Sequence, residues 1–104
     1  MFGFAVLTTV SLPAEQLAET AARLAAESRA LAASPPAGFL GQDVLRSEDG
    51  TEVVLVTRWA AREHFLAFRG QEEVRQRVLE AMEHRPKISF LLPVESVRVG
   101  PPGA

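Results

Sequence analysis

Few residues in this sequence are of types that carry chemistry, and their spacing matches no standard catalytic motif. The chain has no glycine-rich phosphate loop, no HExxH zinc motif, no Gly-x-Ser-x-Gly elbow and no nucleotide-binding fingerprint. With no cysteine, it has no thiolate nucleophile, disulfide or zinc–thiolate site. Its two histidines, His64 and His84, lie in separate segments and fall short of a three-ligand metal shell. We therefore expect no metal and no cofactor.

An aromatic group in the middle of the chain is the best candidate for ligand binding. Trp59, Phe65 and Phe68 have two interpretations: ordinary core side chains, or an aromatic wall for a flat ligand. Ligand pockets in two-layer folds are largely apolar and contain a few polar groups. Arg69 follows directly and either closes the mouth of such a pocket, pairing with an enolate or carboxylate, or is a free surface arginine.

Asp43 is a candidate because aspartate is disfavoured within strands and this one falls in a predicted strand. The alternation of that strand predicts that it shares a face with Phe39, Gly41 and Leu45. Asp43 therefore either pairs with a cation such as Arg58 or lines a polar cavity.

The histidines have different prospects. His64 precedes Phe65 on a predicted helix, so it either borders the ligand pocket or is a solvated boundary residue. His84 falls in the last turn of a helix, where a cation interacts favourably with the helix dipole. We interpret His84 as structural and keep His64 as a candidate ligand-binding residue.

Hydrophobic periodicity predicts the elements that must position these residues. Serine, proline and glycine mark the ends of these elements. Ser11 is the expected N-cap of the first helix, and Glu48-Asp49-Gly50 is the expected tight turn of a hairpin. The expected elements are a strand over 2–10, a helix from Ser11 to about Ala33, hairpin strands within 38–59, a helix over 60–83 broken near Gly70, and a strand over 88–99 bent at Pro93.

The charged residues of the two helical regions are predicted to face solvent. They recur on the side opposite the apolar stripe and are mixed in sign, which is typical of a solvated helix face. On the first helix they are Glu15, Glu19, Arg23, Glu27 and Arg29. On the last helical segment they are Glu72, Glu73, Arg75, Arg77, Glu80 and Glu83.

The order strand–helix–strand–strand–helix–strand predicts an α+β fold of the ferredoxin-like kind, with a four-stranded antiparallel sheet. Two helices can cover only one face of such a sheet, yet the first and third strands are apolar on both faces. A second copy of the chain would cover the other face most economically. We therefore expect a homodimer formed through the sheet face.

Composition limits the possible partners. The 104 residues predict one domain over 1–99 followed by a flexible tail over 100–104. The net charge is −2 with both signs interleaved, so no basic stripe for nucleic acid is present. The apolar N-terminal segment lacks the basic region and cleavage site of a signal peptide, and no run reaches transmembrane length. We expect no membrane association and a cytoplasmic location.

Several residues between 38 and 69 match the sequence pattern of a known family. Gly38-Phe39 with Gly41, the valines 54 and 56 before Trp59, and Phe65 on the following helix resemble the antibiotic biosynthesis monooxygenase family of the dimeric α/β-barrel superfamily. The resemblance covers the whole chain in length and element order. It implies a face-to-face dimer of sheets.

The resemblance also implies a chemistry. Members of the family include oxygenases that act on polycyclic phenols without flavin or metal. There the protein stabilises a substrate anion that gives an electron directly to oxygen, which requires an apolar cavity and a hydrogen-bonding group. The expected function is thus a cofactor-independent, monooxygenase-like activity on a flat aromatic or quinone-like molecule. The alternative is a non-catalytic dimeric barrel that binds a small molecule or serves in stress.

Other members of the family degrade haem, and this chain departs from their pattern. They use an asparagine on the first strand, a tryptophan on the second helix and a histidine further along as iron ligand. The first strand here has no asparagine, Phe68 stands at the tryptophan position, and no histidine lies near Arg77 and Val78. The resemblance therefore favours the oxygenases over the haem degraders.

Overall fold

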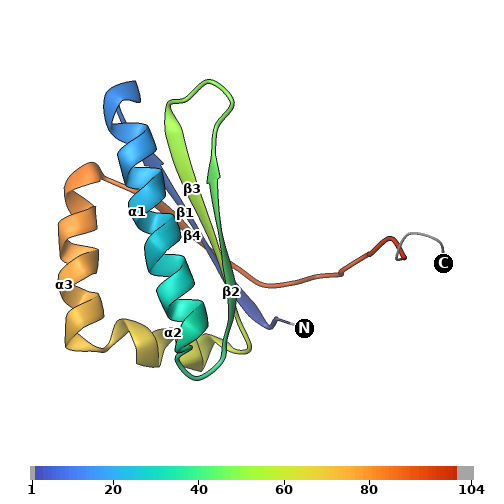
Figure 1. Ribbon diagram of the computed structural model, residues 1–104. Helices are drawn as coiled ribbons and strands as arrows, with labels where there is room; N and C mark the ends of the chain where they lie inside the picture. The colour runs from blue at the N-terminus through green and yellow to red at the C-terminus, as the bar shows by residue number, and fades with distance from the viewer. Residues whose placement is uncertain (1, 101–104) are drawn as a thin grey trace.

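The computed structural model describes residues 2–100 and shows one sheet with helices on one of its faces (Figure 1). The end of the expected tail, residues 101–104, lies outside the described residues. The elements in chain order are β1 (Phe4–Ser11), α1 (Ala14–Ala33), β2 (Phe39–Arg46), β3 (Glu52–Trp59), α2 (Arg62–Arg69), α3 (Glu72–Ala81), the 3-10 turn η1 (Met82–His84) and β4 (Lys87–Leu91).

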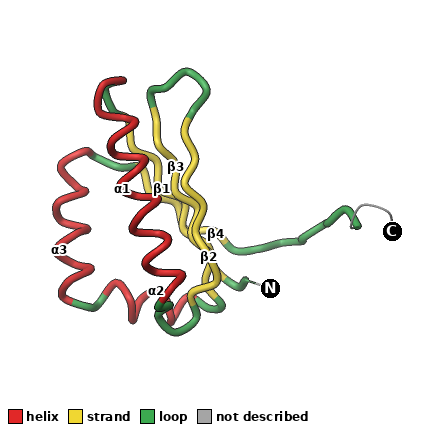
Figure 2. The backbone as a smooth tube through the Cα atoms, in the orientation of Figure 1, coloured by secondary structure: helices red, strands yellow, loops and turns green. Residues whose placement is uncertain are grey.

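The sheet has the order β2-β3-β1-β4, and every neighbouring pair is antiparallel. The helices lie together on one side of it, and the other face of the sheet carries no element of the described chain (Figure 2). This arrangement confirms the predicted α+β, ferredoxin-like fold. The break predicted near Gly70 is also present, between α2 and α3.

Two hydrophobic clusters hold the helices on the sheet, one at each end. The aliphatic end consists of Leu12, Leu17 and Val53, with Val10, Ala21, Leu24 and Val44 packed against them. The aromatic end consists of Phe4, Val6 and Trp59, with Phe39, Phe65 and Phe68 packed against them. The register of β1 and β3 explains the separation, because it pairs Phe4 with Trp59 at one end and Val10 with Val53 at the other.

The hairpin between β2 and β3 closes at the aliphatic end through a turn built on Asp49. Its Oδ1 accepts hydrogen bonds from the Ser47 hydroxyl at 2.6 Å, the Thr51 hydroxyl at 2.7 Å and the Thr51 amide at 3.2 Å. These bonds, the one from Ser47 first, lower the pKa of Asp49 because they favour its charged form. Gly50 follows with φ +73°, a conformation that glycine adopts without steric cost.

Three local predictions were wrong. Ser11 does not cap α1: it ends β1 opposite Glu52, and Pro13 occupies the cap position without a side-chain bond. β4 stops at Leu91, well short of Val99, because proline at position 93 has no amide to donate and restricts the preceding residue. Residues 92–100 form no regular element and extend away from the body (Figure 1).

The third error concerns the face that Asp43 shares. A bulge between Phe39 and Gly41 places Phe39 opposite Trp59 and Gly41 opposite Arg58. The extra residue, Leu40, changes the alternation, so Phe39 packs with Trp59 on the helix side while Asp43 follows Gly41 on the other face. Alternation alone could not reveal this, because a bulge leaves no mark in the hydrophobic pattern.

Candidate functional site

A cavity of about 340 Å³ lies between the helix side of the sheet and the three helices. Apolar side chains from all four strands and all three α-helices form most of its wall, among them Val6, Leu24, Phe39, Leu55, Phe65, Val78 and Phe90. Phe90 comes from the edge strand β4 and is 52% exposed although it lines the cavity, so the cavity is open to solvent along that edge. The volume is at the lower end of the range of ordinary small-molecule pockets.

The cavity arises because α3 does not continue the packing of α1 and α2. α1 packs closely on β2, and α2 packs on the end of β3, whereas the principal contacts of α3 are with α2 and η1. α3 follows the break at Gly70 and stands beside α1, farther from the strands in this view (Figure 1). Its valines Val74 and Val78 therefore face a space that no other helix fills.

Trp59 is the centre of the aromatic wall and is only 1% exposed. Phe39 meets its ring edge-on at a centroid distance of 5.6 Å, Phe68 is tilted against it at 5.2 Å, and Phe65 lies at 6.1 Å. Tilted and edge-on arrangements are the favoured geometries of aromatic pairs. All four aromatic rings line the cavity, which gives it a rigid, flat-sided wall.

The indole nitrogen of Trp59 is buried and has no hydrogen-bond partner within residues 2–100. A buried donor without an acceptor costs about 1–3 kcal/mol, and buried tryptophans usually find a partner. Trp59 lines the cavity, but the nitrogen itself has almost no accessible surface, so an acceptor oxygen on a bound molecule would reach it only after a small shift of the surrounding rings. The unpartnered donor lies in the wall, behind the surface of the cavity.

Three charged side chains line the cavity without an ion pair to any described residue: Glu27 from α1, Arg69 from α2 and Arg77 from α3. Thr8, Gln42 and Thr57 add neutral polar groups from the sheet. Within residues 2–100 no three histidine or carboxylate side chains come together as a metal site would require. The cavity can thus hold a flat molecule and offer it two guanidinium groups and one carboxylate, with the indole N–H of Trp59 buried in the wall behind.

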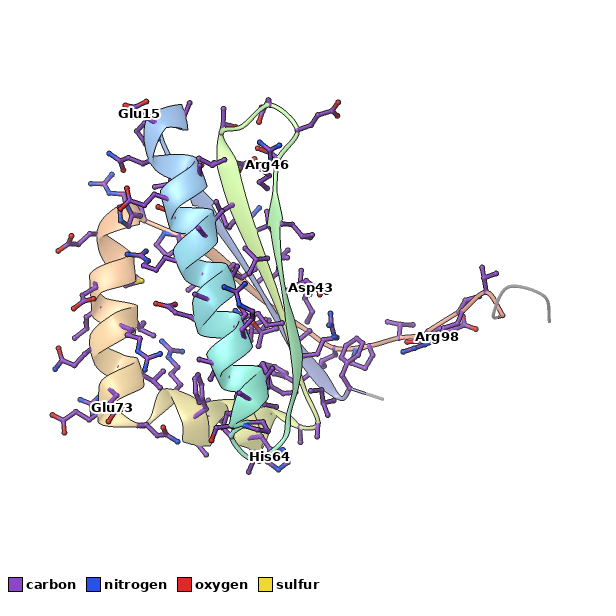
Figure 3. The ribbon with its side chains drawn as sticks, in the orientation of Figure 1. Glu15, Asp43, Arg46, His64, Glu73 and Arg98 are labelled. Carbon is purple, nitrogen blue, oxygen red and sulfur yellow. The ribbon has the colours of Figure 1, made fainter. Side chains whose placement is uncertain are left out.

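Four of the six residues predicted to bind a ligand line this cavity: Trp59, Phe65, Phe68 and Arg69. Asp43 does not. It lies on the opposite face of the sheet, where its side chain points away from the helices (Figure 3). Its Oδ2 accepts a hydrogen bond from Nη1 of Arg58 at 2.8 Å, the pairing that was one of its two predicted roles. At 55% exposure, such a pair contributes little to stability.

His64 also lies outside the cavity lining, at the end of the molecule near α2 (Figure 3). Its ring covers Gly38, whose φ is +78°, so closely that a Cβ at position 38 would overlap it. Its Nδ1 is buried and has no hydrogen-bond partner in the described part of the chain. His64 therefore packs against the start of β2, and only glycine fits beneath it. His84, in η1, is exposed.

Sequence reasoning missed Glu27 and Arg77 as cavity-lining residues, although Arg77 is exposed, in agreement with its assignment to a solvated helix face. The signal was present in the spacing. Glu27 stands three residues after Leu24 and four before Leu31, and Arg77 stands three after Val74. Such spacings place side chains on one helix face. The prediction gave more weight to the charge of these two residues than to their spacing. An open cavity, however, accepts charged groups that a filled core excludes.

Solved structures of similar fold include two oxygenases and one haem degrader. A monooxygenase of Streptomyces coelicolor in complex with nanaomycin D is 21% identical, with a TM-score of 0.76 over 95% of this chain and 94% of that one. The cofactor-independent oxygenase SnoaB of Streptomyces nogalater is 13% identical, with a TM-score of 0.71 over 93% and 98%. The haem degrader MhuD of Mycobacterium tuberculosis is 22% identical, with a TM-score of 0.69 over 91% and 99%. At these identities the likeness establishes the fold.

Sequence comparisons decide the family. No curated protein sequence matches the chain. No helix in the described part of the chain is long and apolar enough to cross a membrane. The sequence model of one family, antibiotic biosynthesis monooxygenase, matches residues 3–79, a span that contains β1 through most of α3 and all the cavity-lining residues of those elements. The chain belongs to the antibiotic biosynthesis monooxygenase family.

Proposed function

We propose that this protein is a cofactor-independent monooxygenase acting on a flat aromatic or quinone-like molecule. The observation that carries the proposal is the aromatic cavity with the buried, unpartnered indole N–H of Trp59 in its wall. A flat ring system with a carbonyl or phenolic oxygen would fit the shape of the wall and satisfy that donor. Family membership supports the same reaction class, as do the two oxygenases among the structures of similar fold.

The proposed chemistry needs only groups that the cavity contains. An anthrone-type ring carbon loses a proton to a base, and the resulting anion gives one electron to O₂. The two radicals combine to a peroxide, whose O–O bond breaks as water leaves. The CH₂ group becomes a carbonyl with one oxygen atom of O₂, and the other becomes water. Donors aimed at the developing oxyanion lower the barrier to the first step.

Particular residues suit these roles. Glu27 is the carboxylate among the described cavity-lining residues, and we assign it as the base. The Trp59 indole nitrogen would donate to the substrate oxygen that gains charge. Phe65 and Phe68 would hold the rings flat and exclude water from the anion, which strengthens the electrostatic interactions there.

The homodimer expected from the sequence is part of the proposal. The face of the sheet opposite the helices pairs Leu7 with Val56 and Leu45 with Val54, and Leu45 and Leu91 are exposed there. Apart from the Arg58–Asp43 ion pair, most of the large side chains on this face are apolar. A largely apolar face of this kind is covered in a stable assembly. Val54→Asp should dissociate the dimer and destabilise it, and a wild-type chain that sediments as a monomer at micromolar concentration would refute the assembly. The cytoplasmic location also stays a prediction.

Oxygen consumption tests the function directly. Wild-type protein, dialysed against a chelator and supplied with neither metal nor flavin, should consume one O₂ per molecule of an anthrone and release the anthraquinone and water, without hydrogen peroxide. Trp59→Phe keeps an aromatic ring but removes the N–H, and Glu27→Gln removes the base while nearly preserving its shape. Both should slow turnover by about tenfold or more.

The same experiment separates the alternative function. A protein that binds quinones but consumes no oxygen with any member of the panel would be the non-catalytic binding protein. Restoration of activity by added flavin or metal would overturn cofactor independence. The open cavity with unpaired charged groups favours an enzyme, because a filled apolar core would leave those groups without a role.

A further inference from the structure

We infer that the ligand of this cavity is an acid: a flat aromatic molecule carrying a carboxylate, which Arg69 and Arg77 bind at the α2–α3 end while the ring oxygen accepts from Trp59. This inference rests on the proposed function and adds the charge of the substrate. It follows from the balance of hydrogen-bonding groups around the cavity, the elements that present them, and the absence of protein partners for them within residues 2–100.

The cavity offers mainly donors. The indole of Trp59 and the guanidinium groups of Arg69 and Arg77 have no acceptor function. Thr8, Gln42 and Thr57 both donate and accept, and Glu27 is the acidic member of the lining. A ligand that satisfies this set must be rich in acceptor oxygens, and one negative charge would balance the excess of arginine over glutamate.

The arginines also lie on connected elements. Arg69 is the last residue of α2 and Arg77 lies within α3, two helices that pack together across the break at Gly70. Glu27 comes from a different helix, α1. A carboxylate would therefore be drawn to the α2–α3 end and repelled from the α1 side. This separation of charge would hold the ligand in one orientation, with its reacting ring carbon toward Glu27.

Neither arginine is already engaged in the protein. The ion pair found among the described residues joins Arg58 to Asp43 on the opposite face of the sheet. A guanidinium group binds a carboxylate through two parallel N–H···O bonds, a geometry that a single neutral oxygen cannot match. Side chains of both arginines are exposed at the rim, so the acid group would remain partly hydrated.

A matched pair of probes tests the charge. Anthraquinone-2-carboxylate and anthraquinone-2-carboxamide have the same rings and differ in the charge of one substituent. Trp59 is the single tryptophan of the sequence and forms the cavity wall, so quenching of its fluorescence reports occupancy of this site. Titration calorimetry on the same samples provides an independent affinity.

The wild-type chain should bind the acid about tenfold or more tightly than the amide, since charge-assisted bonds exceed neutral ones. The double variant Arg69→Gln with Arg77→Gln should remove this preference and leave the affinity for the amide unchanged. Arg75→Gln is the control, because Arg75 lies on the same helix and carries the same charge but does not line the 340 Å³ cavity. Its preference should persist.

The outcomes are separable. Equal wild-type affinity for acid and amide, or a preference lost equally in Arg75→Gln, would overturn the acidic ligand and leave the proposed oxygenase standing if oxygen is consumed with neutral anthrones. Failure of both probes to bind would contradict the proposed function as well. A preference that disappears only in the double variant establishes the acid-binding role of the two arginines.

Discussion

The two ends of the helix-covered sheet face are built from the same strands but differ in how completely they are filled. At the aliphatic end, branched side chains from α1, β1 and β3 close around Leu17 and Val53, which are 4% and 1% exposed. At the aromatic end, Trp59 is equally buried, yet the rings around it border a cavity of about 340 Å³ and its indole nitrogen has no partner.

The comparison indicates that the aliphatic end contributes mainly to stability, whereas the aromatic end leaves space in which a ligand can bind. Small branched side chains interdigitate to near-crystalline density, so their removal leaves a cavity and is costly. Large rigid rings cannot fill the space that remains when α3 stands apart from the sheet. Leu24 belongs to the aliphatic end and also lines the cavity. We expect substitutions at the other residues of the aliphatic end to change stability alone, and substitutions at the aromatic end to change ligand binding.

The largest effect is expected from Leu17→Ala at the aliphatic end. Loss of a side chain that is 4% exposed should lower the free energy of unfolding by about 3 kcal/mol. Leu79→Ala is the matched control, since Leu79 is 65% exposed on α3 and should cost less than about 0.5 kcal/mol. Urea denaturation measures both. Quinone affinity of folded Leu17→Ala should be unchanged, and weakened binding would break the comparison.

The next effect distinguishes two of the three glycines with positive φ, Gly38 at the aromatic end and Gly50 at the aliphatic end. Gly38→Ala should cost about 1–2 kcal/mol for its left-handed backbone, plus a steric term because its Cβ would overlap His64. Gly50→Ala has φ +73° but open space around it, so it should lose only the backbone term. Adding His64→Ala should make the cost of Gly38→Ala equal to that of Gly50→Ala. An undiminished cost would show that His64 does not pack on this glycine.

Phe68→Ala should have a smaller effect on stability and a clear effect on binding. Its ring packs on Trp59 at 5.2 Å but also borders the cavity, so part of the lost contact is with space already open. We expect a loss of about 1–2 kcal/mol, below the 3–5 typical of a phenylalanine in a filled core. Affinity for a flat quinone should fall by about tenfold. A core-sized loss with unchanged affinity would reassign Phe68 to the core.

The smallest effect concerns pH and the turn at the aliphatic end. Hydrogen bonds from Ser47 and Thr51 lower the pKa of Asp49 in the folded chain from its ordinary value near 3.8. Its contribution to stability is therefore present above that value and is lost as the pH falls through the lowered pKa. Asp49→Asn should be slightly less stable than wild type at pH 7 and equal to it in strong acid. Glu48→Gln, in the same turn, is the control, and an unchanged difference at both pH values would contradict the assignment.

Much of the architecture could be predicted from the sequence because it depends on local periodicity and turn chemistry. The element order, the hairpin at Asp49-Gly50, the end of β3 at Trp59 and the break near Gly70 all follow from patterns within a few residues. Pro93 was visible too, yet its effect was underestimated: the strand ends before it rather than bending through it.

The site depended on tertiary structure to a greater degree. Trp59, Phe65 and Phe68 could be named from their type and spacing, but which side chains join them follows from contacts that no local pattern encodes. One bulged residue, Leu40, sends Asp43 to the opposite face. The position of α3 places the exposed Arg77 at the border of the cavity, and the same space admits Glu27.

The sequence by itself determined the secondary-structure order, the apolar faces of the strands and the absence of thiol chemistry, because these follow from residue types and their spacing alone. Only the tertiary structure decided that a cavity exists, that an indole N–H lies buried in its wall without a partner, and that two arginines border it. The physical reason is that cavities, orphaned donors and unpaired charges are properties of how distant segments pack, and packing is settled by the sum of long-range contacts rather than by any one stretch of chain.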